Sequence, residues 1–211
     1  MKLVDCLDTG AASVPTAPCL VTESSVLSYA EVQGLSRTIA ASLAASGVTP
    51  GSTVAVLSAT DPLALTCVLG AGRAGAAWVL VDPEDASAEE VLQELGGCSA
   101  LLFRTTAAPL ARQVDASLPL PHALVSLDGR HDGALSWGEF LVAGATRTVT
   151  VPLGPPAVAT AAPADDRPVL LALGPLTEST AGRWQRVLAQ GGRIVMRPAE
   201  TASAVPARLE A

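Results

Sequence analysis

Signals for helix and strand alternate along the chain between Leu27 and Phe103, and this alternation limits the possible folds more than any other feature. Three apolar runs have the length of buried strands, and residues at helical spacing fill the intervals between them. The runs are continuously apolar, which is typical of strands covered on both faces. The sequence therefore predicts an α/β fold with three layers, in which helices cover both faces of a largely parallel sheet joined by right-handed crossovers. The three predicted strands are Thr53–Ser58, Trp78–Val81 and Ser99–Phe103.

Capping signals mark where the predicted helices begin and end. A Ser followed three residues later by Glu forms a capping box, in which each residue satisfies a backbone N–H of the first turn. Asp61-Pro62 opens another helix, because Pro is favoured at the first helical position, and Gly75 ends that helix. The capping boxes are Ser28 with Glu31, Ser87 with Glu90, and Ser136 with Glu139.

The pattern is less regular after Phe103, and it suggests how the chain is divided. Residues 1–144 are expected to form one α/β region. Residues 145–166, rich in Pro and Ala, are expected to form an extended connector. Residues 167–211 are expected to return as a strand-helix-strand unit packed on the same domain. The predicted elements are a helix at 107–117, strands at 123–127, 147–151, 168–173 and 193–196, a loop and helix within 177–190, and a short helix in the tail from 199.

Composition and charge exclude several classes of partner. The formal net charge is −7 with no basic patch, which argues against nucleic acids and anionic membranes. Three Trp, one Tyr and two Phe are too few for platforms that stack bases or sugars. Apolar runs such as Ala74–Val81 are too short to span a membrane, and the N-terminal stretch lacks the layout of a signal peptide. We therefore expect a cytoplasmic location, with no nucleic acid and no membrane as partners.

Residues that bind metals or cofactors elsewhere have ordinary structural explanations in this chain. The four cysteines form no CxxC pair and are predicted to be buried free thiols. His122 and His131 stand in sequence of turn composition, and with Asp128 and Asp132 they make a poor metal set. The run from Gly70 to Gly75 fits G-x-G-x-x-G, but it closes a helix instead of opening one, so we predict close packing of helix on sheet. No metal, cofactor or catalytic residue is expected. The cysteines are Cys6, Cys19, Cys67 and Cys98.

Several motifs occur in a recognisable order. They are LSYAEV (27–32), GVTPGSTVAVL (47–57), LGAGRAGAAWVLVDP (69–83), GCSALLF (97–103) and LSWGEFLVAG (135–144), followed by LGPLTES (173–179) and LAQGGRIVM (188–196). They resemble the segments LTYAEL, GVxPGDxVAVLL, LGVLKAGAAYVPLDP, SGARLLLT, SFEELLAAG, PLTHSTG and LLAGGRVVL of the adenylate-forming superfamily, which includes acyl-CoA synthetases, peptide-synthetase adenylation domains and luciferases. The resemblance implies the fold of the N-terminal subdomain of those enzymes.

The resemblance also implies what the chain lacks. The family's phosphate loop, TSGTTGxPKG, should fall within residues 148–168, which contain no glycine pair and no lysine. In such a loop, backbone amides, hydroxyls and a lysine stabilise the phosphates of ATP. The only lysine of this chain is Lys2, and the adenine, ribose, hinge and C-terminal segments of the family do not follow Met196. The resemblance therefore implies a truncated member, with the phosphate loop deleted, that does not form acyl-adenylates.

Three functions remain open at this stage. The first is a non-catalytic accessory or interaction protein of natural-product biosynthesis, which self-associates as a homodimer or binds a pathway protein. The second is a binder of a small acyl or aryl acid, or a repurposed enzyme, that uses the residual acyl cleft at Thr177, Glu178 and Ser179. Glu178 stands where many relatives have a histidine, although a carboxylate in a first helical turn is also favoured by the helix dipole. The third is a gene relic without a selected role.

Overall fold

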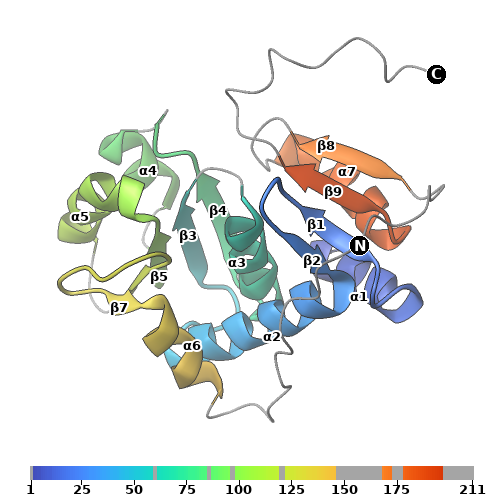
Figure 1. The fold of residues 1–211 in the computed structure, drawn as a ribbon. Helices are drawn as coiled ribbons and strands as arrows, with labels where there is room; N and C mark the ends of the chain where they lie inside the picture. The colour runs from blue at the N-terminus through green and yellow to red at the C-terminus, as the bar shows by residue number, and fades with distance from the viewer. Residues whose placement is uncertain are drawn as a thin grey trace.

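Two β-sheets with helices packed around them make up the protein (Figure 1). The computed structural model describes residues 2–58, 61–84, 87–95, 98–118, 122–145, 168–172 and 178–196. One sheet has five strands in the order β4-β3-β5-β6-β7, and the other has four in the order β2-β1-β9-β8. The expected connector, the edge strand at 147–151 and the tail helix lie outside the described residues.

The five-stranded sheet confirms the predicted strand-helix alternation. Its strands all run parallel, with β3 and β5 in the middle and buried along nearly their whole length. Val56, for example, lies between Leu80 of β4 and Leu102 of β5. The strands are β3 (Thr53–Leu57), β4 (Ala77–Val81), β5 (Ala100–Phe103), β6 (Ala123–Ser126) and β7 (Leu135–Ser136).

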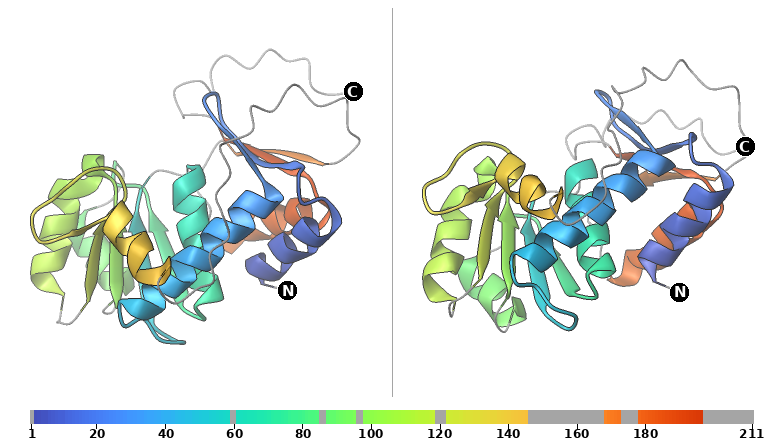
Figure 2. Two further views of the ribbon diagram at one scale, coloured as in Figure 1. Left: turned by 60° about the horizontal axis from the view of Figure 1, so that its bottom comes forward. Right: turned by 90° about the horizontal axis from the view of Figure 1, so that it is seen from below.

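Helices cover both faces of this sheet, as the continuous apolar strands require (Figure 2). On one face, α4 (Ala88–Leu95) and α5 (Ala108–Ser117) pack over a cluster that contains Leu101 and Phe103. On the other face lie α2 (Tyr29–Ala45), α3 (Pro62–Arg73) and α6 (Trp137–Ala145), over a cluster that contains Val54 and Val56. A short 3-10 turn, Thr105–Ala107, leads into α5.

The predicted helix starts are present in the structure. Ser28 Oγ accepts a hydrogen bond from the Glu31 backbone N–H (3.3 Å), and Glu31 Oε2 accepts one from the Ser28 N–H (2.7 Å). Asp61 caps α3, and Gly75 has φ +75°, the left-handed backbone that ends a helix. The prediction that the glycines near Gly70 pack a helix on the sheet needs correction. A Cβ at Gly70 would overlap Ile39 of α2, so the close approach is between two helices.

The four-stranded sheet joins the two ends of the described chain. Its strands are β1 (Pro18–Val21), β2 (Val26–Ser28), β8 (Val169–Ala172) and β9 (Arg193–Met196), and only the β1–β2 pair is antiparallel. Helices α1 (Leu3–Ser13) and α7 (Glu178–Ala189) pack against each other beside it. The elements α1, β1 and β2 were not predicted, because β1 is short, its register shifts between Pro18 and Leu20, and its parallel partner β9 is distant in sequence.

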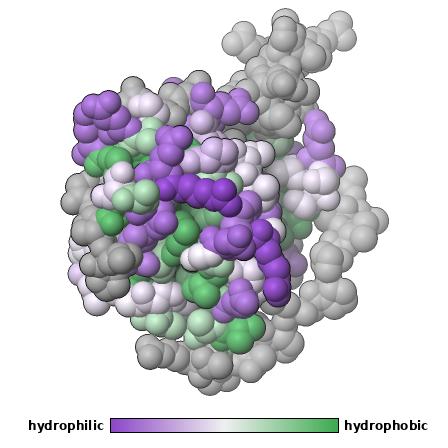
Figure 3. Space-filling view, turned by 90° about the vertical axis from the view of Figure 1, so that its left-hand side faces the viewer, coloured by the Kyte–Doolittle hydropathy of each residue, from purple (hydrophilic) through white to green (hydrophobic). Residues whose placement is uncertain are grey.

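The β7 end of the five-stranded sheet is adapted to solvent. Hydrophilic side chains cover much of the face at this end, with hydrophobic ones scattered between them (Figure 3). Two large hydrophobic residues of the described ranges are exposed. They are Leu135, with an exposed fraction of 41%, and Val142, with an exposed fraction of 63%. No helix among the described residues is long and apolar enough to cross a membrane.

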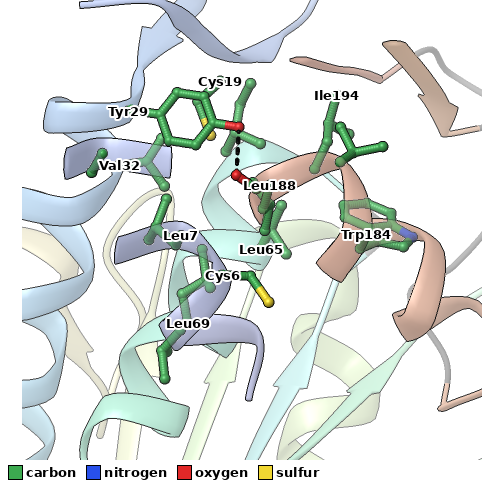
Figure 4. Packing of buried hydrophobic residues seen from close by; sticks show 14 of the residues in the cluster. Cys6, Leu7, Cys19, Tyr29, Val32, Leu65, Leu69, Trp184, Leu188 and Ile194 are labelled. Atoms are coloured by element: carbon green, nitrogen blue, oxygen red, sulfur yellow. Dashed lines mark hydrogen bonds between the residues drawn. The ribbon is translucent and has the colours of Figure 1, made fainter. Parts of the chain in front are cut away.

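Tyr29 connects the two ends of the described chain inside the core (Figure 4). Its ring is fully buried, and its hydroxyl donates to the carbonyl oxygen of Gly192 (2.6 Å) or Leu188 (3.2 Å). A Cβ on Gly10 of α1 would overlap both the Tyr29 ring and the Leu188 carbonyl. Glycine at position 10 therefore allows α1, α2 and α7 to meet.

A second polar contact joins α1, α2 and α3. Asp8 of α1 forms an ion pair with Arg73 of α3, with Arg73 Nη1 at 2.9 Å from Asp8 Oδ2. Gln33 of α2 donates to Asp8 Oδ1 (2.7 Å), and Arg73 Nε donates to Ser36 Oγ (2.8 Å). The hydrogen bond from Arg73, together with that from Gln33, holds the pKa of Asp8 below its ordinary value although burial opposes the shift.

We expect Tyr29→Phe to lower the free energy of unfolding by about 1–3 kcal/mol, because a buried carbonyl oxygen loses its donor. Urea denaturation followed by circular dichroism measures this change. Ser117→Ala is the matched control, since it removes an exposed hydroxyl that bonds only within its own helix (3.2 Å to the Gln113 oxygen). Equal stabilities of Tyr29→Phe and the control would show that the hydroxyl does not hold the junction.

The Asp8 ion pair predicts a pH-dependent loss of stability. A carboxyl whose pKa is depressed on folding stabilises the protein above its unfolded pKa of about 3.9, and this contribution disappears as the pH falls through the lower folded value. Asp8→Asn should therefore be less stable than the wild type at pH 7, and the two urea midpoints should converge below about pH 4. Asp132→Asn, at an exposed turn residue, is the control. A difference that persists unchanged at pH 3 would contradict this prediction.

Candidate functional site

Polar side chains gather at the carboxyl edge of the five-stranded sheet. The chain passes from β3 to β4 on one side and then to β5 on the other, so the strand order reverses at β3. Ligands of open parallel sheets bind in the crevice at such a reversal. The residues that follow the strands there are Ser58 and Asp61 after β3, Arg104 and Thr105 after β5, and Asp128 after β6.

Arg104 is at the centre of this network. Its Nη2 lies 3.0 Å from Asp61 Oδ2, and its Nη1 lies 3.3 Å from Asp128 Oδ2. Burial acts to lower the pKa of the guanidinium, but the hydrogen bonds and charges of Asp61 and Asp128 raise it overall. Arg104 therefore stays charged and ties together the loops that follow β3, β5 and β6.

Both carboxylates of the network are also committed to backbone groups. Asp61 Oδ1 accepts from the N–H groups of Leu63 (2.8 Å) and Ala64 (3.0 Å), and Oδ2 accepts from Ser58 Oγ (2.9 Å). Asp128 Oδ1 accepts from the Thr105 N–H (2.6 Å). These hydrogen bonds fix the geometry of the loops that follow β3, β5 and β6.

A cavity of about 400 Å³ opens beside Arg104, between the two sheets. The turn between β1 and β2 supplies hydroxyl groups on one side, and the first turn of α3 closes the other. Three of the five N–H groups of Arg104 are directed at the two carboxylates, and the other two have no partner among the described residues and could bind a ligand oxygen. The cavity has the size of a small-molecule site. Its lining residues are Thr22, Ser24, Ser25, Leu27, Leu35, Asp61, Pro62, Leu63, Thr66 and Arg104.

The two histidines do not share a site. His131 packs its ring against Phe103 (centroids 5.2 Å apart), and its Nε2 lies 3.2 Å from Thr105 Oγ1 at the carboxyl edge. His122 lies before β6, at the opposite end of that strand, and its buried ring places Nε2 2.7 Å from Asp115 Oδ1. No group of three His, Cys, Asp or Glu among the described residues could hold a metal ion.

The cysteines are buried free thiols, as predicted. Burial raises the pKa of Cys19 to about 12 and that of Cys98 to about 11. Burial also raises the pKa of Cys6 and Cys67. The thiolate is the reactive form of cysteine, so none of the four is suited to nucleophilic catalysis near neutral pH.

The acyl-cleft residues predicted from the sequence are only partly described. Thr177 lies outside the described residues. Glu178 and Ser179 form the start of α7, where the backbone is described but their side chains are not. Their proposed contact with a ligand stays a prediction.

The Arg104 network was missed at the sequence level, although a signal for it exists. Asp61, Arg104 and Asp128 each follow a predicted strand within a few residues. Because the carboxyl ends of parallel strands meet at one edge of a sheet, charged residues in such positions are expected to converge.

Comparison with known proteins identifies the family of this chain. The family model described as AMP-binding enzyme matches residues 7–171. The chain belongs to this family. It is 34% identical over 129 residues to the AMB antimetabolite synthetase AmbE of Pseudomonas aeruginosa, across 61% of this chain and 6% of the relative. It is 33% identical over 135 residues to 4-coumarate--CoA ligase 3 of Oryza sativa subsp. japonica, across 63% of this chain and 24% of the relative.

Two solved structures share the fold of this chain. One is a protein assigned as a long-chain-fatty-acid CoA ligase from Rhodopseudomonas palustris (TM-score 0.75, 19% identity, 93% of this chain and 57% of that one). Another is the amide bond synthetase McbA from Marinactinospora thermotolerans (TM-score 0.68, 18% identity, 93% and 44%). The chain therefore spans about half of these structures and a quarter or less of the curated relatives.

We expect Arg104→Met to lower the free energy of unfolding by about 1–2 kcal/mol, because Asp61 and Asp128 then face each other without a cation. Arg104→Lys should recover only part of the loss, since an ammonium lacks the planar fork that reaches both carboxylates. Arg112→Met, at an exposed residue of α5 with no ion pair among the described residues, is the control. If urea denaturation finds Arg104→Met as stable as this control, Arg104 does not stabilise the fold by joining the loops that follow β3, β5 and β6.

Proposed function

We propose that this AMP-binding family member does not form acyl-adenylates, and that it acts as an accessory or interaction protein in natural-product biosynthesis. The observation that carries the proposal is the sequence between α6 and β8. In this position the family resemblance calls for a loop with paired glycines and a lysine, and residues 146–167 contain neither. Without them, the phosphates of ATP lose the donors and the positive charge that stabilise them.

The position of Lys2 supports the proposal. It is the residue before α1, it is exposed, and its backbone N–H donates to Asp5 Oδ2 (2.8 Å). Helix α1 packs beside the four-stranded sheet, whereas the polar crevice lies at the carboxyl edge of the other sheet. Lys2 is therefore a poor substitute for the lysine of a phosphate loop.

The charge at the carboxyl edge also disfavours a polyphosphate. Arg104 is bracketed by Asp61 and Asp128, so this cluster carries one positive and two negative charges. A triphosphate would have to approach two carboxylates or displace them from Arg104 and from the backbone N–H groups that they accept. This arrangement suits a structural role better than nucleotide binding.

A second candidate function is the binding of a small acyl or aryl acid. The cavity beside Arg104 favours it, because it combines apolar walls with hydroxyl groups and two unused guanidinium N–H donors. A neutral or singly charged ligand oxygen is compatible with the local charge, unlike a triphosphate. The predicted cleft at 177–179 is an alternative location for the same ligand class.

We expect no acid-dependent exchange between ATP and pyrophosphate for any member of a panel of acyl, aryl and amino acids. The measurement uses labelled pyrophosphate, with an intact adenylate-forming enzyme as the positive control. Exchange above background that depends on one acid would refute the non-adenylating proposal.

The same protein, examined by native mass spectrometry, separates the two candidate functions. A complex with itself or with a pathway protein supports the interaction role. A monomer that retains a panel acid supports the second candidate, and loss of this adduct in Leu35→Trp, which fills the cavity, or in Glu178→Gln would locate the ligand.

A further inference from the structure

The cavity beside Arg104 lies next to more negative than positive charge. Asp61 and Arg104 are the charged residues of its described lining, and Asp128 contacts Arg104 from outside that lining. The three side chains are partly buried, with exposed fractions of 24% for Asp61, 30% for Arg104 and 37% for Asp128. Because partly buried charges are screened less than exposed ones, a ligand in the cavity experiences a cluster with a net charge of −1.

The free hydrogen-bonding capacity of this cluster is on Arg104 and not on Asp61. Asp61 accepts hydrogen bonds from Ser58 Oγ and from the N–H groups of Leu63 and Ala64, and its Oδ2 also contacts Arg104 Nε (3.1 Å) and Nη2 (3.0 Å). A carboxylate has about four lone-pair sites, so Asp61 has none left for a ligand donor. The two N–H groups of Arg104 without a partner among the described residues are available to a ligand acceptor.

A carboxylate ligand gains little from Arg104, because two carboxylates already contact the guanidinium. A ligand oxygen on the available N–H groups lies near Asp61, which binds the same guanidinium through Oδ2. Attraction to one cation is then opposed by repulsion from two anions, so the Coulomb energies largely cancel. Removing a carboxylate from water costs far more than removing an amide, and no net attraction offsets that cost. An uncharged carbonyl oxygen accepts from the same N–H groups without this cost.

We propose that this cavity binds a small uncharged carboxamide, whose carbonyl oxygen accepts from Arg104, and that it discriminates against the corresponding carboxylate. The amide N–H needs an acceptor, and the hydroxyl oxygens of Thr22 and Ser25 line the side of the cavity formed by the β1–β2 turn. The two hydroxyls are held together, with Thr22 Oγ1 2.9 Å from Ser25 Oγ. An ester or ketone has no N–H for these oxygens, so an amide uses more of the cavity.

The apolar part of the lining determines the rest of the ligand. Leu27 of β2 and Leu35 of α2 lie in the lining with Pro62 and Leu63 from the first turn of α3. Each is only partly buried in the free protein, so a ligand that covers them removes apolar surface from water. The volume of about 400 Å³ suits a phenyl ring or a short alkyl chain on the amide. The inference rests on the second candidate function and replaces the acid by its uncharged amide.

Binding of matched amide and acid pairs to the full 211-residue chain tests the inference. The probes are benzamide with benzoate and hexanamide with hexanoate, titrated by ligand-observed NMR at pH 7, where both acids are ionised. At least one amide should bind, about tenfold or more tighter than its acid, because one net charge near the ligand has an effect of this size. Leu35→Trp, which fills the cavity, and Ser25→Trp, which obstructs it from an exposed turn, should both abolish binding.

Asp128→Asn tests the charge argument, because Asp128 is outside the described lining. Its amide oxygen can still accept from the Thr105 N–H, which lies 2.6 Å from Oδ1 in the wild type. With the cluster then neutral, the preference for the amide should narrow by about tenfold, mainly through tighter binding of the acid. Asp132→Asn removes a charge from an exposed residue of the same loop and should leave the preference unchanged. Equal changes in both variants would show that the net charge of the chain, and not this cluster, sets the preference.

The other outcomes separate this inference from the proposed functions. An acid that binds as tightly as its amide, or amide binding that survives in both Trp variants, would overturn it. If an acid binds in the cavity and its amide does not, the inference fails while the second candidate function stands. If no probe binds up to its solubility limit, the inference and the second candidate function fail together for this cavity. The interaction role is then still decided by the complexes seen in native mass spectrometry.

Discussion

The hydroxyl of Tyr29 joins parts of the chain that are 163 positions apart, and the four-stranded sheet depends on this junction. β1 and β2 alone would form a short antiparallel pair, which is marginal in water. The pairing of Leu20 with Ile194 adds β9 and then β8, and the Tyr29 hydroxyl fixes the turn before β9 through Gly192. A buried hydroxyl must keep its partner, so this bond specifies one arrangement where apolar packing alone would accept several.

The Arg104 network performs the same task at the carboxyl edge of the other sheet. There, three loops leave three parallel strands, and each loop would otherwise expose charged side chains separately. One guanidinium between Asp61 and Asp128 brings them together, and the carboxylates in turn cap α3 and hold Thr105. The chemistry that this edge can offer is limited by that task, because both carboxylates are held by Arg104 and by backbone N–H groups, and only two of the five N–H groups of Arg104 have no partner among the described residues.

Local periodicity predicted the strands from β3 to β6 and the caps of their helices, because each signal lies within a dozen residues. It did not predict β1 and β2, whose stability comes from a distant return of the chain, and it assigned Gly70 to the sheet when the contact is with Ile39. Which element a glycine faces depends on tertiary packing, and periodicity cannot specify that. The same limit applies to Arg104: its position after a strand was visible in the sequence, but its two partners follow from the strand order. The predicted cleft at 177–179 lies where side chains are not described.

The two edge strands of the five-stranded sheet differ in length: β4 has five residues, whereas β7 has two. An exposed apolar strand edge carries a risk of unspecific association, which is why such edges are normally short or charged. The β7 end follows this rule, and the β4 end does not.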